Sequence, residues 1–169
     1  KILEEESETT GGLNVGHGSS KIAGEVDIDG GKLTVVDFAD VSSNQSPAPE
    51  LTITKNVKVS NAGEILVMGT KDAKGNNYPG KLTINQNLTV SGSGSKVTVG
   101  SLKDSDAQGI LIVEGDTIVD DKGSIVVGQN GIISLANATV DNNSNIVVGQ
   151  NGTATFAGTT TVDNNSNIE

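Results

Sequence analysis

The sequence contains no cysteine, no tryptophan and no arginine, and it has one histidine in 169 residues. Without cysteine, disulfide bonds and thiolate metal sites are excluded. The single histidine, His17, lies in a Gly-His-Gly segment, so a histidine-rich metal site cannot form within one chain. We expect His17 to be a solvated turn residue rather than a catalytic base. These absences disfavour an enzyme.

Aromatic residues are also scarce, with Phe38, Tyr78 and Phe156 as the three in the chain, so a core must be a thin stack of aliphatic side chains. The formal net charge is −10 and the eleven lysines are scattered. Because binding to phosphates needs clustered cations, nucleic acid is set aside as a partner. No apolar run approaches the roughly 18 residues of a membrane-spanning helix. The opening KILEEESETT lacks the basic and apolar regions of a signal peptide, so we expect a mature segment.

What the chain has in abundance is β-branched aliphatic residues, because Val and Ile together number 33 against 10 Leu. Such side chains prefer a pleated surface to a helix and favour strands. A repeat accompanies them. SIVVGQNG at 124–131 returns as NIVVGQNG at 145–152, and TVDNNSNI at 139–146 returns at 161–168. The repeating unit is therefore about 21 residues long, a length typical of solenoids.

Each unit contains three short β-branched segments separated by Gly, Asn, Asp or Ser, the residues of tight bends. We therefore predict an all-β fold, a right-handed parallel β-helix or β-solenoid with triangular coils of about 21 residues and corner insertions. Residues 1–11 would be an N-terminal segment, and residues 12–169 a solenoid of about six coils within a longer repeat array. An antiparallel β-sandwich also uses short strands, but it does not predict near-identical units 21 residues apart.

The three predicted sides can be assigned along the chain. First-side strands are expected at 21–24, 51–53, 82–84, 110–113, 133–135 and 154–156. Second-side strands are expected at 26–28, 57–59, 88–90, 117–119, 138–140 and 160–162. Third-side strands are expected at 13–16, 33–36, 64–68, 96–99, 124–127 and 145–148, with another starting at 167–168. The last apolar residue of each second side should then form one column, comprising Ile28, Val59, Val90, Val119, Val140 and Val162.

Extra residues in the earlier units fall at one corner, after the third side, at 38–50, 70–80 and 101–109. A solenoid tolerates insertions at one corner, because each coil needs only the backbone of its neighbours. Stacked loops would give a regular rod an irregular surface, so we predict partner contacts there; the alternative is that the loops are merely tolerated. The candidate partner-binding residues are Pro47, Pro49, Asp72, Lys74, Tyr78, Pro79, Lys103, Asp104 and Asp106.

The corner after the second side carries Asp120, Asp141 and Asp163, which should stack in successive coils. Carboxylates about 4.8 Å apart repel each other, and a divalent cation would relieve that repulsion. We therefore predict weak calcium binding by these three carboxylates, with no other cofactor; the alternative is that they point into water. The neighbouring pair Asn142 and Asn164 is expected to belong to a structural amide ladder between coils.

The segment DNNSNIVVGQNGTATFAGTTTVDNNSNI resembles the Gly/Asn/Thr/Val-rich passenger repeats of autotransporter (type V secreted) adhesins of Gram-negative bacteria. The resemblance covers most of the chain from residue 12 onward. It implies a right-handed β-helix on the bacterial cell surface or in the extracellular medium. It also implies an adhesive or structural role, in cell–cell or host adhesion, aggregation or biofilm, with self-association or a cell-surface glycan or protein as partner.

Two other functions remain open from the sequence. Open solenoid ends expose unpaired backbone, so the chain could be the subunit of a head-to-tail extracellular filament. Phage tailspikes and polysaccharide lyases use the same architecture, so a polysaccharide-binding or polysaccharide-degrading β-helix is the other alternative. Such proteins normally present clustered carboxylates or Arg and Lys together with aromatic platforms for sugar rings. This sequence has no Arg or Trp, and Tyr78 is its one plausible exposed ring.

Overall fold

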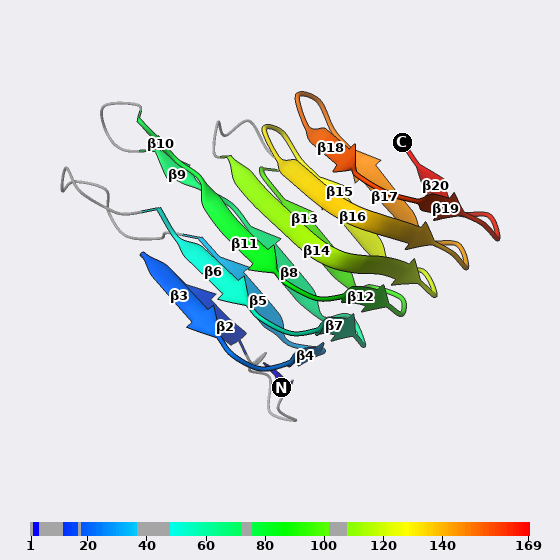
Figure 1. Ribbon diagram of the computed structural model, residues 1–169, viewed down its shortest axis with the longest axis horizontal. Helices are drawn as coiled ribbons and strands as arrows, with labels where there is room; N and C mark the ends of the chain where they lie inside the picture. Colours follow the sequence, from blue (N-terminus) through cyan, green and yellow to red (C-terminus); the bar gives the residue numbers. More distant parts are fainter. Residues whose placement is uncertain (1, 4–11, 17, 37–47, 72–75, 102–107) are drawn as a thin grey trace.

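The computed structural model describes residues 2–3, 12–16, 18–36, 48–71, 76–101 and 108–169. Within these residues every regular element is a β-strand. The strands form a parallel 11-stranded sheet (sheet A), a parallel 7-stranded sheet (sheet B) and a small two-stranded ribbon. Sheet A lies in front of sheet B in Figure 1. The prediction of an all-β chain built from parallel strands is confirmed for this part of the chain.

Sheet A has two limbs, which correspond to the predicted first and second sides. The first limb comprises β3 (Ser19–Ile22), β6 (Glu50–Ile53), β11 (Gly80–Ile84), the first halves of β14 (Gly109–Asp120) and β16 (Ile132–Val140), and β18 (Thr153–Phe156). The second limb comprises β1 (Ile2–Leu3), β4 (Val26–Asp29), β7 (Val57–Ser60), β12 (Leu88–Ser91), the second halves of β14 and β16, and β19 (Thr160–Val162).

Sheet B corresponds to the predicted third side. It comprises β2 (Gly12–Val15), β5 (Lys32–Val35), β8 (Glu64–Val67), β13 (Lys96–Val99), β15 (Ser124–Val127), β17 (Asn145–Val148) and β20 (Asn167–Ile168). The ribbon is antiparallel and pairs β9 (Thr70–Lys71) with β10 (Asn77–Tyr78). We use "rung" for a first-limb strand together with the second-limb and sheet B strands that follow it along the chain, and we count β1 and β2 as a partial first rung.

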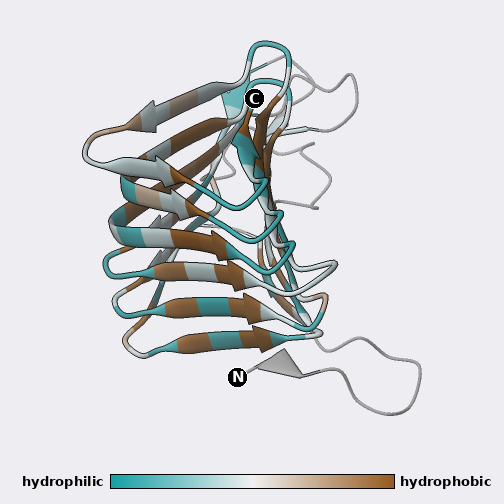
Figure 2. Ribbon diagram, turned by 90° about the vertical axis from the view of Figure 1, so that its right-hand side faces the viewer, coloured by the Kyte–Doolittle hydropathy of each residue, from teal (hydrophilic) through white to brown (hydrophobic). Residues whose placement is uncertain are grey.

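The strand register stacks like residues over like in all three rows of strands. The predicted second-side column is present in full, because each of its members pairs with the next: Ile28, Val59, Val90, Val119, Val140 and Val162. Equivalent columns run from Ile22 to Phe156 in the first limb. In sheet B the column runs from Val15 to Val148. Figure 2 shows the strands stacked along the molecule, with hydrophobic and hydrophilic residues alternating along them.

The core lies between the two sheets and consists of the inward residues of these columns. They are Val, Ile and Leu almost throughout, and Ile28, Val59 and Val119 are fully buried. One continuous cluster joins both sheets. Alternation places polar residues outward, as in β12, where Leu88 and Val90 are buried and the intervening Thr89 is half-buried. The thin aliphatic core expected from the composition is therefore observed.

Two strands are longer than the predicted segments of three to five residues. β14 has 12 residues and β16 has 9, and each passes from the first limb to the second without a break. The pairing of the two strands is irregular between Val113 and Asp116, so the chain bends at this point instead of making a tight turn. A smaller correction concerns β3, which occupies Ser19–Ile22 and not 21–24. Within the expected N-terminal segment, β1 pairs with β4.

The corner from the second limb to sheet B is a true tight turn with a left-handed backbone. Its two central residues have positive φ in successive rungs, for example 52° and 62° at Asn142 and Asn143, and 47° and 60° at Asn164 and Asn165. Asn, Asp and Gly adopt this conformation at the lowest cost. The frequency of Asn and Asp at this corner is therefore explained by the backbone geometry.

Candidate functional site

The predicted calcium residues lie where the sequence placed them, at the corner that follows the second limb. The backbone N–H groups of Asp141 and Asp163 donate to the carbonyl groups of Val119 and Val140 in the preceding rung, at 2.9 and 3.0 Å. Asp120, Asp141 and Asp163 therefore occupy equivalent positions in three successive rungs.

Each carboxylate of this corner is engaged by N–H donors. Oδ1 of Asp120 accepts from Nδ2 of Asn142 at 2.7 Å, and Oδ1 of Asp141 accepts from Nδ2 of Asn164 at 2.6 Å. The same oxygens accept from the backbone N–H of the next residue in their own turn, both at 2.7 Å. An amide is thus interposed between the carboxylates of neighbouring rungs, which lowers their mutual repulsion without a metal. We call this arrangement the Asp–Asn ladder.

The described residues contain no group of three or more His, Cys, Asp or Glu side chains close enough to hold a metal ion. In the Asp–Asn ladder the second carboxylate oxygen, Oδ2, remains as the oxygen that a cation could reach. Calcium binding by Asp120, Asp141 and Asp163 stays a prediction. In the predicted amide ladder, Asn142 and Asn164 donate hydrogen bonds to the carboxylates of the preceding rung.

The structure describes three of the nine candidate partner-binding residues. Pro49 is buried directly before β6, and its role as a partner contact stays a prediction. Tyr78 and Pro79 are half-buried, and Tyr78 pairs with Thr70 in the β9–β10 ribbon. The other six lie outside the described residues, as does His17: Pro47, Asp72, Lys74, Lys103, Asp104 and Asp106.

A second polar ladder, which the sequence reasoning missed, follows the corner between the two limbs of sheet A. Oδ1 of Asn56 accepts from the backbone N–H of Asn87 at 3.2 Å, and Oδ1 of Asn87 accepts from the backbone N–H of Asp116 at 2.9 Å. Nδ2 of Asn137 then donates to Oδ1 of Asp116 at 2.9 Å, and Oδ1 of Asn137 accepts from the backbone N–H of Thr159 at 3.0 Å. The ladder fixes the position of these side chains from rung to rung.

The sequence did carry a signal for this ladder. Asn56, Asn87, Asp116 and Asn137 each directly precede the first residue of a second-limb segment. In the last repeat the equivalent residue is Thr159, so the near-identical C-terminal repeats do not display the pattern.

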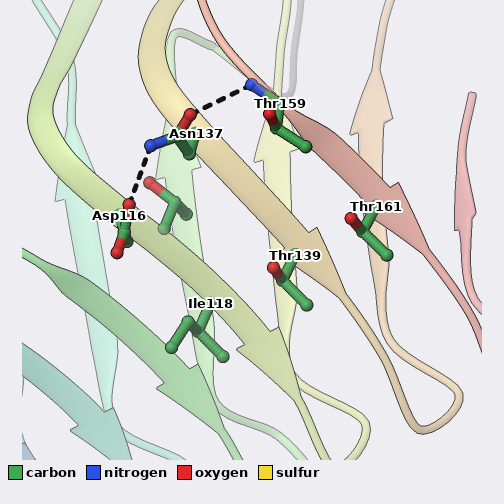
Figure 3. Close-up of a pocket in the computed structure, with 7 residues that line it drawn as sticks. Asp116, Ile118, Asn137, Thr139, Thr159 and Thr161 are labelled. Carbon is green, nitrogen blue, oxygen red and sulfur yellow. Dashed lines mark hydrogen bonds between the residues drawn. The ribbon is translucent and has the colours of Figure 1, made fainter.

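A groove lies on the outer surface of the second limb, beside the end of this ladder. It has a volume of about 270 Å³ and crosses β14, β16 and β19 (Figure 3). Its polar side chains stand on neighbouring strands, and one aliphatic side chain, Ile118, stands among them. The lining residues are Asp116, Thr117, Ile118, Asn137, Thr139, Thr159 and Thr161.

No helix among the described residues is long and apolar enough to span a membrane. Comparison of the chain with protein-family models, with curated proteins and with solved structures finds no match.

Proposed function

We propose that this chain is a right-handed β-solenoid with three-sided coils, and that it serves an adhesive or structural role on a bacterial cell surface or in the extracellular medium. The observation that carries the proposal is the unbroken in-register column from Ile28 to Val162. Such a column is what results when each coil stacks on the backbone of the one before it. A rod of this kind extends by adding rungs, and it suits display at a distance from a surface.

The polar ladders support the same role. A repeat protein in which each rung contacts only its neighbours gains stability from every inter-rung interaction, and here side-chain hydrogen bonds join successive rungs at two corners. These hydrogen bonds order the corners and make them part of a stiff scaffold. Partner binding would then belong to the outer surface beside them and to the corner insertions.

The adhesive role is tested by displaying the 169-residue chain on non-adherent bacteria and measuring cell–cell aggregation and attachment to cultured epithelial cells. We expect both to rise above those of cells displaying an unrelated protein. The matched variant replaces the corner insertion at residues 68–79 by Gly-Gln-Asn, which is the short sequence of the equivalent corner at residues 128–130. It should keep the strand content of the parent by circular dichroism and attach less than the parent. Attachment by neither chain would contradict the proposal, and equal attachment by both would contradict a role for this loop.

End-to-end association is a second candidate, supported by exposed apolar residues on both terminal rungs. Leu13 in β2 is 39% exposed and Val162 in β19 is 43% exposed. Sedimentation that shows elongated oligomers, reduced by Val162→Lys but not by Ile118→Lys, would support it; a monomer at all concentrations would contradict it.

A further inference from the structure

Ile118 interrupts a polar column on the outer surface of the second limb. The residues that pair with one another along this column are Asp27, Lys58, Thr89, Ile118, Thr139 and Thr161. Ile118 is 38% exposed, and the described residues include two other exposed large hydrophobic side chains, Leu13 and Val162. Those two lie on terminal rungs, where no further strand covers one side of the residue. Ile118 has a rung on either side, so the end of a stack does not explain its exposure.

The groove around Ile118 presents hydroxyl, amide and carboxylate groups in fixed positions. Asn137 is held at both ends of its amide, because Nδ2 donates to Asp116 and Oδ1 accepts from Thr159. Oδ2 of Asp116 remains as an acceptor, and the hydroxyl groups of Thr139 and Thr161 stand in register on adjacent strands (Figure 3). A rigid apolar surface beside pre-positioned polar groups is the usual composition of a small ligand site.

We propose that this groove binds a neutral glycan chain, a proposal that rests on the adhesive function given above and names its ligand class. A sugar ring has one face of C–H groups and a rim of hydroxyls. The C–H face packs on Ile118, while the hydroxyls donate to Asp116 and exchange hydrogen bonds with Thr139 and Thr161. Because each rung repeats the strand spacing of about 4.8 Å, the groups are arranged along a line, as an extended chain of sugars requires.

Charge selects neutral glycans over anionic ones. The chain carries a net charge of −10, the groove contains one carboxylate and its lining includes no Lys. Uronic acids, sialic acids and sulfated sugars would be repelled. A peptide strand is disfavoured for another reason, because the groove lies over β14, β16 and β19, whose backbones are already paired with one another, so β-strand addition has no free edge there.

The volume of about 270 Å³ is small for a ligand site, and the groove is open to solvent. A single site should therefore bind weakly, in the millimolar range, and many copies on a cell surface would supply avidity. Weak individual sites are consistent with adhesion, which depends on the number of contacts.

The test is a titration of the isotope-labelled 169-residue chain with cellohexaose, maltohexaose and chitohexaose, followed by nuclear magnetic resonance. We expect at least one of these neutral hexasaccharides to shift the Ile118 methyl signal and the amide signals of Thr139 and Thr161. The variant Ile118→Thr restores the polar column and should fold as the parent does, with affinity reduced about tenfold or more. The matched control is Ile112→Thr, which makes the same change between Thr83 and Ser134 in the first limb and should bind normally.

The proposal is overturned if none of the three probes shifts these signals at millimolar concentration, or if Ile118→Thr binds as well as the parent. It is also overturned if a heparin hexasaccharide binds the groove more tightly than the neutral probes. The results distinguish a failure of the glycan site from a failure of the adhesive function. If cells that display the chain attach but the chain binds no hexasaccharide, the glycan site alone is contradicted. If the chain neither supports attachment nor binds hexasaccharide, both proposals are contradicted.

Discussion

Nδ2 of Asn142 donates a hydrogen bond to Oδ1 of Asp120 across 2.7 Å, from one rung to the next. The relationship recurs one rung later, between Asn164 and Asp141, and at the other end of the molecule, where Asn61 donates to Asp29. The corner residues thus do two things. Their left-handed backbone makes the turn, and their side chains join the rungs.

The Asp–Asn ladder predicts that Asn142→Asp destabilises the fold. The change replaces a donor by a carboxylate opposite Asp120, and like charges on neighbouring strands cost up to about 1 kcal/mol. The matched control is Asn143→Asp, which adds the same charge in the same turn at a similar positive φ without touching Asp120. Thermal unfolding should show a lower midpoint for Asn142→Asp than for Asn143→Asp. Equal midpoints would show that the hydrogen bond contributes nothing.

Calcium binding by Asp120, Asp141 and Asp163 is tested by isothermal titration calorimetry. We expect weak uptake, with a dissociation constant on the order of 10⁻⁴–10⁻³ M as in extracellular calcium modules. Asp141→Asn removes the central carboxylate and should abolish the uptake. Absence of any heat with the parent chain, together with a melting temperature that a chelator leaves unchanged, would dispose of the site.

Gly131 is a position where the stacking of rungs leaves no room for a side chain. A Cβ there would lie 2.2 Å from the carbonyl oxygen of Val99. Gly131→Ala should therefore destabilise the fold by about 1–3 kcal/mol, the usual cost of overpacking. Gly24 offers the control, because a Cβ at Gly24 meets nothing within 4 Å. Chemical denaturation should show a loss for Gly131→Ala and almost none for Gly24→Ala; similar losses for both would refute the close packing.

Thr117 is a polar residue in an apolar column. It pairs with Leu88 on one side and Ala138 on the other, it is 1% exposed, and its Oγ1 has no hydrogen-bond partner. Thr117→Val keeps the shape and removes a buried hydroxyl that has no hydrogen-bond partner, which should stabilise the chain by about 1 kcal/mol. Denaturant unfolding measures the change. A loss of stability would mean that the hydroxyl has a partner in solution.

The repeat made most of the fold predictable. Near-identical segments 21 and 22 residues apart predicted the strands of the later rungs. The alternation of apolar and polar residues then extended the predicted register to Ile28 and Val59, in rungs that have little sequence identity with the later ones. The continuous course of β14 and β16 was not predictable in this way. It depends on the bend between Val113 and Asp116. No repeated sequence feature around this bend distinguishes one continuous strand from two strands joined by a turn.

The candidate site was less predictable. The Asp corner was found because the repeat displays it, but the donors that engage each carboxylate depend on side-chain directions. The groove was not predictable from the sequence. The alternation that places Val119 inward also places Ile118 outward, but the residues beside Ile118 on neighbouring strands become evident only when the strands are paired.

The account depends most on the register of adjacent rungs, and disulfide trapping tests it directly. The chain has no cysteine of its own, so Thr139→Cys with Thr161→Cys introduces one pair on strands that are paired in register. Strands about 4.8 Å apart place these Cα atoms within disulfide range. Thr89→Cys with Thr161→Cys, three rungs apart in the same column, is the control. We predict rapid oxidation of the first pair to an intramolecular disulfide and none of the second; equal oxidation of the two pairs would contradict the stacked register.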